Sequence, residues 1–125
     1  MPAAPAAHHI ETFPEPRRVR VRINGDTVAD SERALALTEG SLPTRWYIPR
    51  EDISAELEPS ERRTTCPFKG EAAHFSVGGE EAVAWSYEQP IEQVSAIREL
   101  VAFYNERVDI EVDGESQDRP PTQWS

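Results

Sequence analysis

Cysteine and lysine are almost absent from this chain of 125 residues, and long apolar runs are missing altogether. The single cysteine, Cys66, excludes an internal disulfide and any zinc site built from Cys-x-x-Cys pairs. Because no stretch of about 18 apolar residues occurs, the sequence predicts no transmembrane helix and no membrane partner. The 13 lysine and arginine residues stand against 23 acidic ones, a net charge of −10 that argues against nucleic acid as a partner.

Both ends of the chain are expected to lie outside the folded domain. Residues 1–16 are rich in proline and alanine and contain neither lysine nor arginine, so we interpret them as a disordered leader rather than a signal peptide. Residues 114–125 are mostly polar and are interpreted as a disordered tail. The remaining residues, 17–113, predict a single domain. The missing signal sequence and the lack of paired cysteines predict a cytoplasmic location.

The apolar pattern predicts a domain made mainly of β-strands. Residues 17–23 alternate strictly between arginine and aliphatic side chains, and Asn24 and Gly25 follow them as a strong hairpin signal. Gly78 and Gly79 separate the two strands of a second predicted hairpin. The predicted strands span residues 17–23, 26–30, 33–38, 45–48, 73–77, 82–86 and 108–113.

Three other segments give weaker signals. Residues 51–57 fit either a short helix or a strand, and an irregular loop is expected after Pro59 and through Gly70. Apolar residues recur at helical spacing over residues 92–105, which predicts one C-terminal helix. Residues 100–104 would also suit a buried strand, so this assignment stays open.

Two rows of opposite charge lie on the first and last predicted strands. The basic row consists of Arg18, Arg20 and Arg22, and the acidic row of Asp109, Glu111 and Asp113. Carboxylates at alternate strand positions can hold a metal ion, but they can also form a solvated face. Opposite charges on paired strands attract by about 0.2–1 kcal/mol per pair. We therefore predict that these two strands are neighbours, with both rows on a common face.

Cysteine and lysine each occur once in the chain, and these two residues, Cys66 and Lys69, lie only three positions apart. In a chain that otherwise uses arginine, a retained lysine indicates a role that arginine cannot fill, since a buried ammonium can lose its proton. An ammonium beside a thiol also favours the thiolate. The alternative is a buried cysteine packed beside a surface lysine. His74 would complete a Cys–His pair if the fold brought it within hydrogen-bond reach of Cys66.

Aromatic residues gather in the same parts of the sequence. Trp46 and Tyr47 share one predicted strand, Phe68 lies in the expected loop, and Trp85 and Tyr87 end the second hairpin on one face. These side chains belong in part to the core. A tryptophan or tyrosine, with its polar group, near a cysteine and a lysine is also typical of the lining of a pocket for a small molecule.

Residues 17–114 resemble the family known as domain of unknown function 427. The most specific string is Thr65-Cys66-Pro67-Phe68-Lys69-Gly70-Glu71-Ala72. Supporting strings are Val28-Ala29-Asp30-Ser31, Glu39, Tyr47-Ile48-Pro49-Arg50-Glu51-Asp52, Ala84-Trp85-Ser86-Tyr87, Pro90, Ala102-Phe103-Tyr104 and Val108-Asp109.

The resemblance implies a mainly β fold, a small β-tent of two packed antiparallel sheets with one short C-terminal helix. This fold is similar to that of the Mss4-like proteins and the drug-binding domain of cereblon. Those relatives often hold zinc through two Cys-x-x-Cys pairs, so here the shape is expected without zinc or another cofactor. The fold implies a pocket between its sheets. Carried over by position, its lining is expected to consist of Glu39, Tyr47, Cys66, Lys69, Trp85 and Tyr87.

Two hypotheses of different functional classes follow from the segment that contains Cys66 and Lys69. The leading hypothesis is a binding domain for a small polar or anionic metabolite, in which Lys69 supplies the charge and Glu39 a hydrogen-bond acceptor. The alternative is an enzyme that uses Cys66 as a nucleophile or redox thiol activated by Lys69. Members of this family are sometimes described as nucleotidyltransferases, enzymes that usually have a Gly-Ser segment ahead of a strand with paired carboxylates. Here Gly40-Ser41 is not followed by such a strand. The sequence therefore gives that description little support.

Overall fold

The computed structural model describes residues 9–120, and these residues form three antiparallel β-sheets. Sheet A has the strand order β1-β4-β5, sheet B the order β11-β10-β2-β3, and sheet C the order β6-β7-β8-β9. The strands are β1 (Ile10–Glu15), β2 (Val19–Ile23), β3 (Asp26–Ser31), β4 (Ala34–Glu39), β5 (Arg45–Tyr47), β6 (Glu58–Cys66), β7 (Gly70–Val77), β8 (Glu80–Tyr87), β9 (Val101–Phe103), β10 (Asp109–Val112) and β11 (Glu115–Ser116). The predicted mainly β class is confirmed, with three sheets instead of the expected two.

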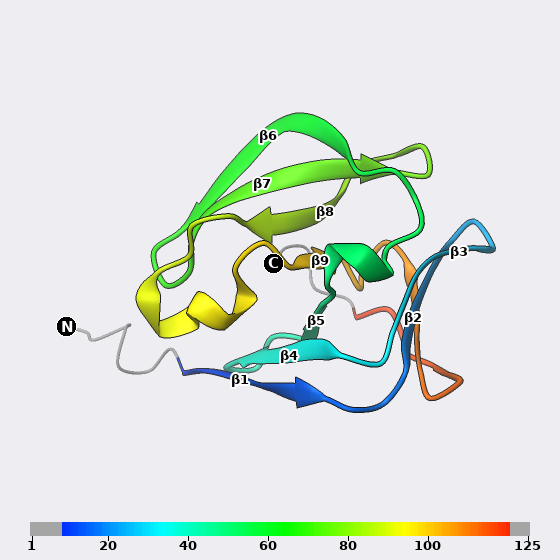
Figure 1. Cartoon of the computed structure of the whole chain (residues 1–125), viewed down its shortest axis with the longest axis horizontal. Coiled ribbons are helices and arrows are strands. Elements are labelled where there is room, and N and C mark those ends of the chain that lie inside the picture. The colour runs from blue at the N-terminus through cyan, green and yellow to red at the C-terminus, as the bar shows by residue number, and fades with distance from the viewer. Residues whose placement is uncertain (1–8, 121–125) are drawn as a thin grey trace.

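Sheets A and C face each other and are joined along one edge. Ile48, directly after β5, exchanges two backbone hydrogen bonds with Val101 at the start of β9, with N···O distances of 2.8 and 2.9 Å. The joined edge is therefore formed by β5 and β9, while β1 and β6 are the outer strands of the two sheets. In Figure 1, β6 and β7 form the upper layer and β1 and β4 the lower one.

Two clusters of buried apolar side chains fill the interior. The alternation of β5 divides its side chains between them, because successive residues of a strand point to opposite faces. Trp46 and Ile48 belong to the larger cluster, which is shared with sheet B. Tyr47 belongs to the second cluster, together with Trp85 and Tyr87. This second cluster lies between sheets A and C and supplies the aromatic side chains of the site described below.

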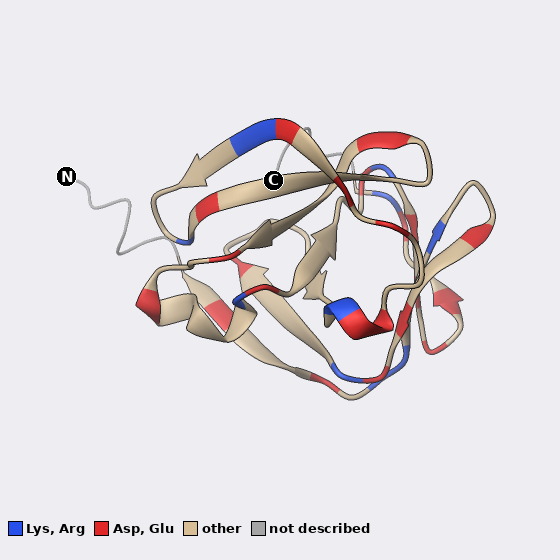
Figure 2. Cartoon of the chain, turned by 45° about the horizontal axis from the view of Figure 1, so that its top comes forward, with Lys and Arg blue, Asp and Glu red and all other residues tan. Residues whose placement is uncertain are grey.

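The predicted pairing of the first and last strands is confirmed. In the register of β2 and β10, Arg20 stands opposite Glu111, and Arg22 stands opposite Asp109. Glu111 lies 3.6 Å from the Arg22 guanidinium and 4.0 Å from that of Arg20. Asp30 on the neighbouring β3 accepts a hydrogen bond of 2.6 Å from Arg18. Glu111 of the acidic row and Asp30 of β3 are therefore both paired with arginines of the basic row. Figure 2 shows basic and acidic segments interspersed along the ribbon.

The expectation of a disordered leader is wrong for residues 10–15. These residues form β1, which pairs with β4 over its whole length, from Ile10 opposite Glu39 to Glu15 opposite Ala34. The strand is tolerant of Pro14 because β1 is an edge strand, where a missing N–H costs no ladder bond on the open side. The proline-rich composition of residues 1–16 therefore led to a wrong prediction of disorder for β1. The rest of the expected leader, residues 1–8, lies outside the described residues.

The expected disordered tail is wrong for its first residues. Asp113 and Gly114 adopt positive φ values of 53° and 83° and turn the chain into β11, which pairs with β10. Asn24 and Gly25, which close the hairpin of β2 and β3, adopt the same kind of conformation. The Asp-Gly pair is an equally strong hairpin signal, so the sequence alone could have predicted β11. Residues 121–125 lie outside the described residues.

Two assignments in the middle and C-terminal parts of the chain are also wrong. The expected loop before Cys66 is the nine-residue strand β6, whose polar, largely exposed side chains give no apolar alternation. The predicted helix over residues 92–105 is only the short 3-10 helix η2 (Glu92–Ile97), followed by β9. Glu99 interrupts the segment with a φ of 63°. The alternative of a buried strand near residues 100–104 is therefore confirmed.

The remaining ambiguous segment, residues 51–57, contains part of the short 3-10 helix η1 (Arg50–Asp52) and is otherwise irregular. The two 3-10 helices are the only helices in the described part of the chain. None of the helices found between residues 9 and 120 is long and apolar enough to cross a membrane.

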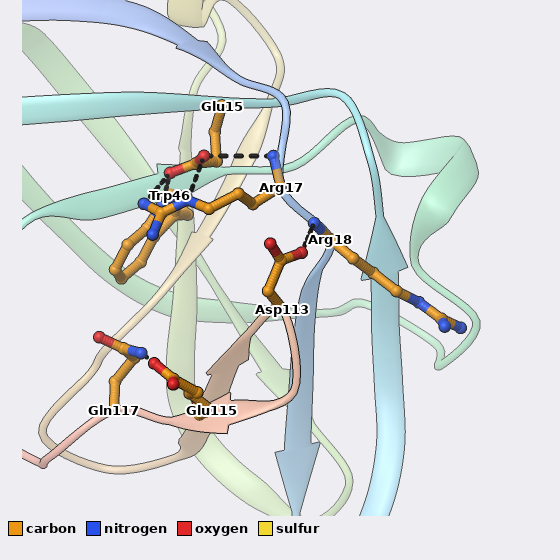
Figure 3. A network of polar contacts seen from close by, with 7 residues as sticks. All are labelled: Glu15, Arg17, Arg18, Trp46, Asp113, Glu115 and Gln117. Carbon is orange, nitrogen blue, oxygen red and sulfur yellow. Dashed lines mark hydrogen bonds and ion pairs between the residues drawn. The ribbon is translucent and has the colours of Figure 1, made fainter.

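A buried carboxylate fixes β1 to its neighbours (Figure 3). Glu15 accepts hydrogen bonds from the Arg17 side chain at 2.8 and 2.9 Å and from the Trp46 indole at 3.1 Å. The Arg17 hydrogen bonds, helped by the one from Trp46, lower the pKa of Glu15 from 4.5 to about 2 against the opposing effect of burial. Nearby, Asp113 accepts a hydrogen bond from the Arg18 backbone. The Glu15–Trp46 contact therefore holds β1 to β5 within sheet A, and the Asp113–Arg18 contact holds the adjoining ends of β10 and β2 together in sheet B.

Candidate functional site

A cavity of about 290 Å³ opens between sheets A and C. It is bounded by the ends of β4 and β5 on one side, by β6 and β8 on the other, and by the turn that joins β6 to β7. The structure brings all six residues of the predicted lining together around it. They are Glu39, Tyr47, Cys66, Lys69, Trp85 and Tyr87.

The turn between β6 and β7 holds Cys66 and Lys69 at the cavity. The Lys69 backbone N–H donates to the Cys66 carbonyl at 3.1 Å, and the Lys69 carbonyl accepts from Ile91 at 2.9 Å. Gly70 follows with a φ of 119°, and a Cβ at this position would come within 3.3 Å of the Gln89 carbonyl oxygen. Glycine is therefore required here by both the backbone conformation and the close approach of the next segment. The turn is fixed by these contacts.

Lys69 does not present an isolated positive charge. Its ammonium donates a hydrogen bond of 2.5 Å to Glu39 Oε1, and each of the two side chains is only 10% exposed. Glu39 lies at the end of β4, thirty residues away in the sequence. The two residues were predicted as separate charge and acceptor groups for a ligand. The structure instead joins them as a buried ion pair on the cavity wall.

The aromatic side chains provide both walls and hydrogen-bond donors. The Trp85 indole donates to the Tyr47 hydroxyl at 3.1 Å, and the two rings meet edge to face. The Tyr87 hydroxyl has no hydrogen-bond partner among residues 9–120, although Tyr87 is only 5% exposed and lines the cavity. Burial raises the pKa of both tyrosines, so both phenols keep their protons at neutral pH. The Tyr87 hydroxyl is free to donate to a ligand.

Arg45 is a cavity residue that the sequence reasoning missed. It is 4% exposed and donates to both carboxylate oxygens of Glu106, at 2.9 and 3.0 Å, and to Asn105 at 2.7 Å. Its guanidinium also lies 5.4 Å from the centre of the Trp85 ring. The alternation of β5 was an available signal, because Arg45 stands two residues before Tyr47 and so shares its face. Other cavity residues not predicted as lining are Leu42, Pro43, Thr64, Thr65, Pro67 and Phe68.

His74 does not form the hypothesised pair with Cys66. Its Nε2 is hydrogen-bonded to the Thr64 hydroxyl at 2.8 Å, and its ring stacks on Tyr104. No hydrogen bond joins His74 to Cys66 among the described residues. Burial, with the charges of Arg62 and Arg63, lowers the pKa of His74 to about 4, so its ring is neutral at pH 7. His74 therefore supports the wall behind Thr64.

The acidic row on β10 does not gather into a ligand set. Within the part of the chain that the structure describes, no group of three or more histidine, cysteine, aspartate or glutamate side chains is arranged to hold a metal ion. Asp109 instead accepts a hydrogen bond from Arg119, and Glu111 lies between Arg20 and Arg22. These contacts fit the interpretation of the row as a solvated face paired with arginines.

The chemistry available in the cavity is mixed. Aromatic rings supply apolar walls, the phenol of Tyr87 supplies a donor, and the pair of Lys69 and Glu39 supplies a proton donor beside a proton acceptor. The Cys66 thiol adds a nucleophile at the same wall. Pockets for small ligands range from roughly 300 to 1,000 Å³, so a cavity of about 290 Å³ suits a molecule smaller than most drugs.

A family model described as "Domain of unknown function (DUF427)" matches residues 11–114. The match covers most of the chain, includes all six predicted lining residues, and extends over most of β1. It confirms the resemblance noted from the sequence. No curated protein matches the chain.

Proposed function

From the premise that this chain belongs to the family of domain of unknown function 427, we propose that it binds a small polar molecule between sheets A and C. The observation that carries the proposal is the Tyr87 hydroxyl, which belongs to a cavity-lining residue only 5% exposed and has no hydrogen-bond partner among the described residues. The Tyr87 oxygen is not one of the fully enclosed unpartnered atoms of the described residues, which are Arg22 Nε and His74 Nδ1, so it is accessible from the cavity. A ligand that accepts a hydrogen bond from Tyr87 would gain about 0.5–1.5 kcal/mol from it.

The charges of the cavity favour a polar ligand over a strongly anionic one. Lys69 is already neutralised by Glu39, and Arg45 by Glu106. An anion would therefore have to compete with a carboxylate for the Lys69 ammonium. A neutral group that accepts one hydrogen bond from Tyr87 and one from Lys69 fits without breaking the pair, because an ammonium has three donors. The proposal involves neither nucleic acid nor a membrane, and it places binding in the cytoplasm, where a lone thiol stays reduced.

A panel of small polar metabolites, screened by thermal shift, tests this function. We expect at least one compound to raise the melting temperature of the protein, and Tyr87→Phe to weaken its binding by about threefold to tenfold. This range corresponds to one neutral hydrogen bond of about 0.5–1.5 kcal/mol. Titration of the compound into the wild-type and variant proteins, followed by calorimetry, measures the change.

Tyr104→Phe is the matched control. Tyr104 belongs to the same buried cluster as Tyr87 but is absent from the lining of the cavity. Its substitution removes the same atom from the same residue type and should leave the dissociation constant unchanged. A panel without a single hit, or an equal loss of affinity in both variants, would contradict the proposed site.

The alternative function is an enzyme in which Cys66 acts as a nucleophile or redox thiol activated by Lys69. Both residues line the cavity, which is the observation in its favour. We expect Cys66 to react with iodoacetamide no faster than free cysteine at neutral pH, because Glu39 occupies the Lys69 ammonium. The alkylation rate is measured against pH by mass spectrometry. A rate at pH 7 about tenfold above that of free cysteine would favour the enzyme over the binding domain.

A further inference from the structure

The buried pair of Lys69 and Glu39 is suited to a reaction that goes beyond non-covalent binding. We propose that the cavity captures a small aldehyde or ketone, whose carbonyl carbon forms a reversible imine with Lys69 Nζ. This inference rests on the proposed function, because the carbonyl compound must first enter the cavity. It specifies the polar group of the ligand and assigns a covalent role to Lys69.

The choice of lysine at this position is the first argument. Lys69 is the one lysine among 13 lysine and arginine residues, and arginine makes the chain's other lysine-or-arginine ion pairs with carboxylates. Arginine is the usual residue for a buried ion pair, since its planar guanidinium binds a carboxylate through two hydrogen bonds. Arg45 and Glu106 show that arrangement at the wall of this same cavity. Only lysine supplies a primary amine that can form an imine.

The surroundings of Lys69 Nζ are the second argument. Glu39 Oε1 lies 2.5 Å away, within reach of a direct proton transfer from the ammonium. Tyr87 lines the same cavity with an unused hydroxyl, and burial, together with Tyr47, Cys66 and Glu39, raises its pKa. The phenol therefore stays protonated and can donate to a carbonyl oxygen. An amine, a proton acceptor and a hydrogen-bond donor thus line one cavity.

The step balances without an oxidant or a reductant. Glu39 takes a proton from the Lys69 ammonium, and the neutral amine forms a C–N bond as the carbonyl π pair moves to oxygen, held by the Tyr87 hydroxyl. The oxygen takes up a second proton from the nitrogen, which gives the carbinolamine. Glu39 then returns its proton to that hydroxyl group, which leaves as water while the nitrogen lone pair forms the C=N bond. The sum is ammonium plus carbonyl to protonated imine plus water.

Trapping with sodium cyanoborohydride tests the proposal on the full chain. Glycolaldehyde, pyruvate and benzaldehyde are the probes, and each imine is reduced to a stable secondary amine. Trypsin does not cleave after an alkylated lysine, so labelling joins residues 64–69 and 70–98 into one peptide that mass spectrometry detects. We expect one probe to label Lys69 in the native protein about tenfold faster than in the protein denatured in guanidinium chloride, because Glu39 assists the transfer.

The comparison of native and denatured protein separates the proposal from a structural ion pair. A pair that only stabilises the fold protects the amine, so native labelling would be equal to or slower than denatured labelling, and this result would overturn the proposal. Glu39→Gln and Tyr87→Phe should each slow native labelling about tenfold, while Glu11→Gln, an exposed glutamate on β1, should not. If Glu39→Gln fails to fold, Tyr87→Phe keeps the test decisive, and unchanged labelling in it contradicts the proposal.

The two proposals fail in different ways. A compound that raises the melting temperature through Tyr87, while no probe yields a trapped adduct at Lys69, overturns imine formation and leaves binding intact. A panel in which no carbonyl or other polar compound raises the melting temperature, and no adduct forms, overturns both.

Discussion

Lys69→Met is expected to lower the free energy of unfolding by about 3–5 kcal/mol, because it leaves the Glu39 carboxylate buried without its cation. Methionine keeps most of the length and the apolar stem of lysine, so loss of packing contributes little. Denaturation with guanidinium chloride, followed by tryptophan fluorescence, measures the change.

The double variant Lys69→Met with Glu39→Gln is the matched control. It removes both charges and keeps the shape of both side chains, so we expect it to recover about 2 kcal/mol or more of the loss. A double variant as unstable as the single one would show that the unpaired carboxylate is not the cause. The double variant should also fold and yet form no adduct with a carbonyl probe.

Glu15→Gln is expected to lower the free energy of unfolding at neutral pH by about 2–3 kcal/mol. The pKa of Glu15 is lowered to about 2, mainly by Arg17, so the folded state binds a proton more weakly than the unfolded chain. The stabilisation is therefore complete above pH 4.5 and is lost as the pH falls through the folded value near 2. The difference between wild type and variant should follow the same course when unfolding is measured at several pH values.

Glu11→Gln on the same strand is the control for this prediction. The Glu11 side chain is exposed and pairs with His9, itself exposed, so its substitution should change stability by less than about 0.5 kcal/mol. Because Trp46 donates to Glu15, a change in the native fluorescence spectrum of Glu15→Gln is also expected. A loss of stability that stays constant from neutral pH to pH 2 would contradict the role assigned to the ionised carboxylate.

Local patterns predicted much of the fold because the relevant interactions are local or repeat along a strand. The alternation in β2 and the Asn24-Gly25 turn defined the first hairpin. The basic and acidic rows predicted the pairing of β2 with β10, although Arg20 and Glu111 are 91 positions apart in the sequence. The prediction succeeded because charge complementarity can be read in both strands independently. β1 and β6 were missed because their polar, proline-containing sequences resemble loops when read alone.

The lining of the cavity was anticipated through the family resemblance, and the structure brings those six residues together. The contacts among them were not anticipated. Lys69 was expected to offer its charge to a ligand, but it is paired with Glu39; His74 was considered for Cys66, but it is bonded to Thr64. Arg45 was overlooked although the alternation of β5 places it on the face of Tyr47. Its pairing with Glu106 could not be predicted, because no pattern in either segment points to the other.

Cys66 and Lys69, each the single residue of its type, show what the sequence determined and what the tertiary structure decided. The sequence by itself determined that Cys66 and Lys69 share one turn, because three positions cannot separate them far. It also determined a mainly β domain, because alternation and turn residues act within a few positions. Only the tertiary structure decided what Lys69 touches, since the approach of sheets A and C brings β4 to the β6–β7 turn. That approach depends on packing of the whole core, which no single segment encodes.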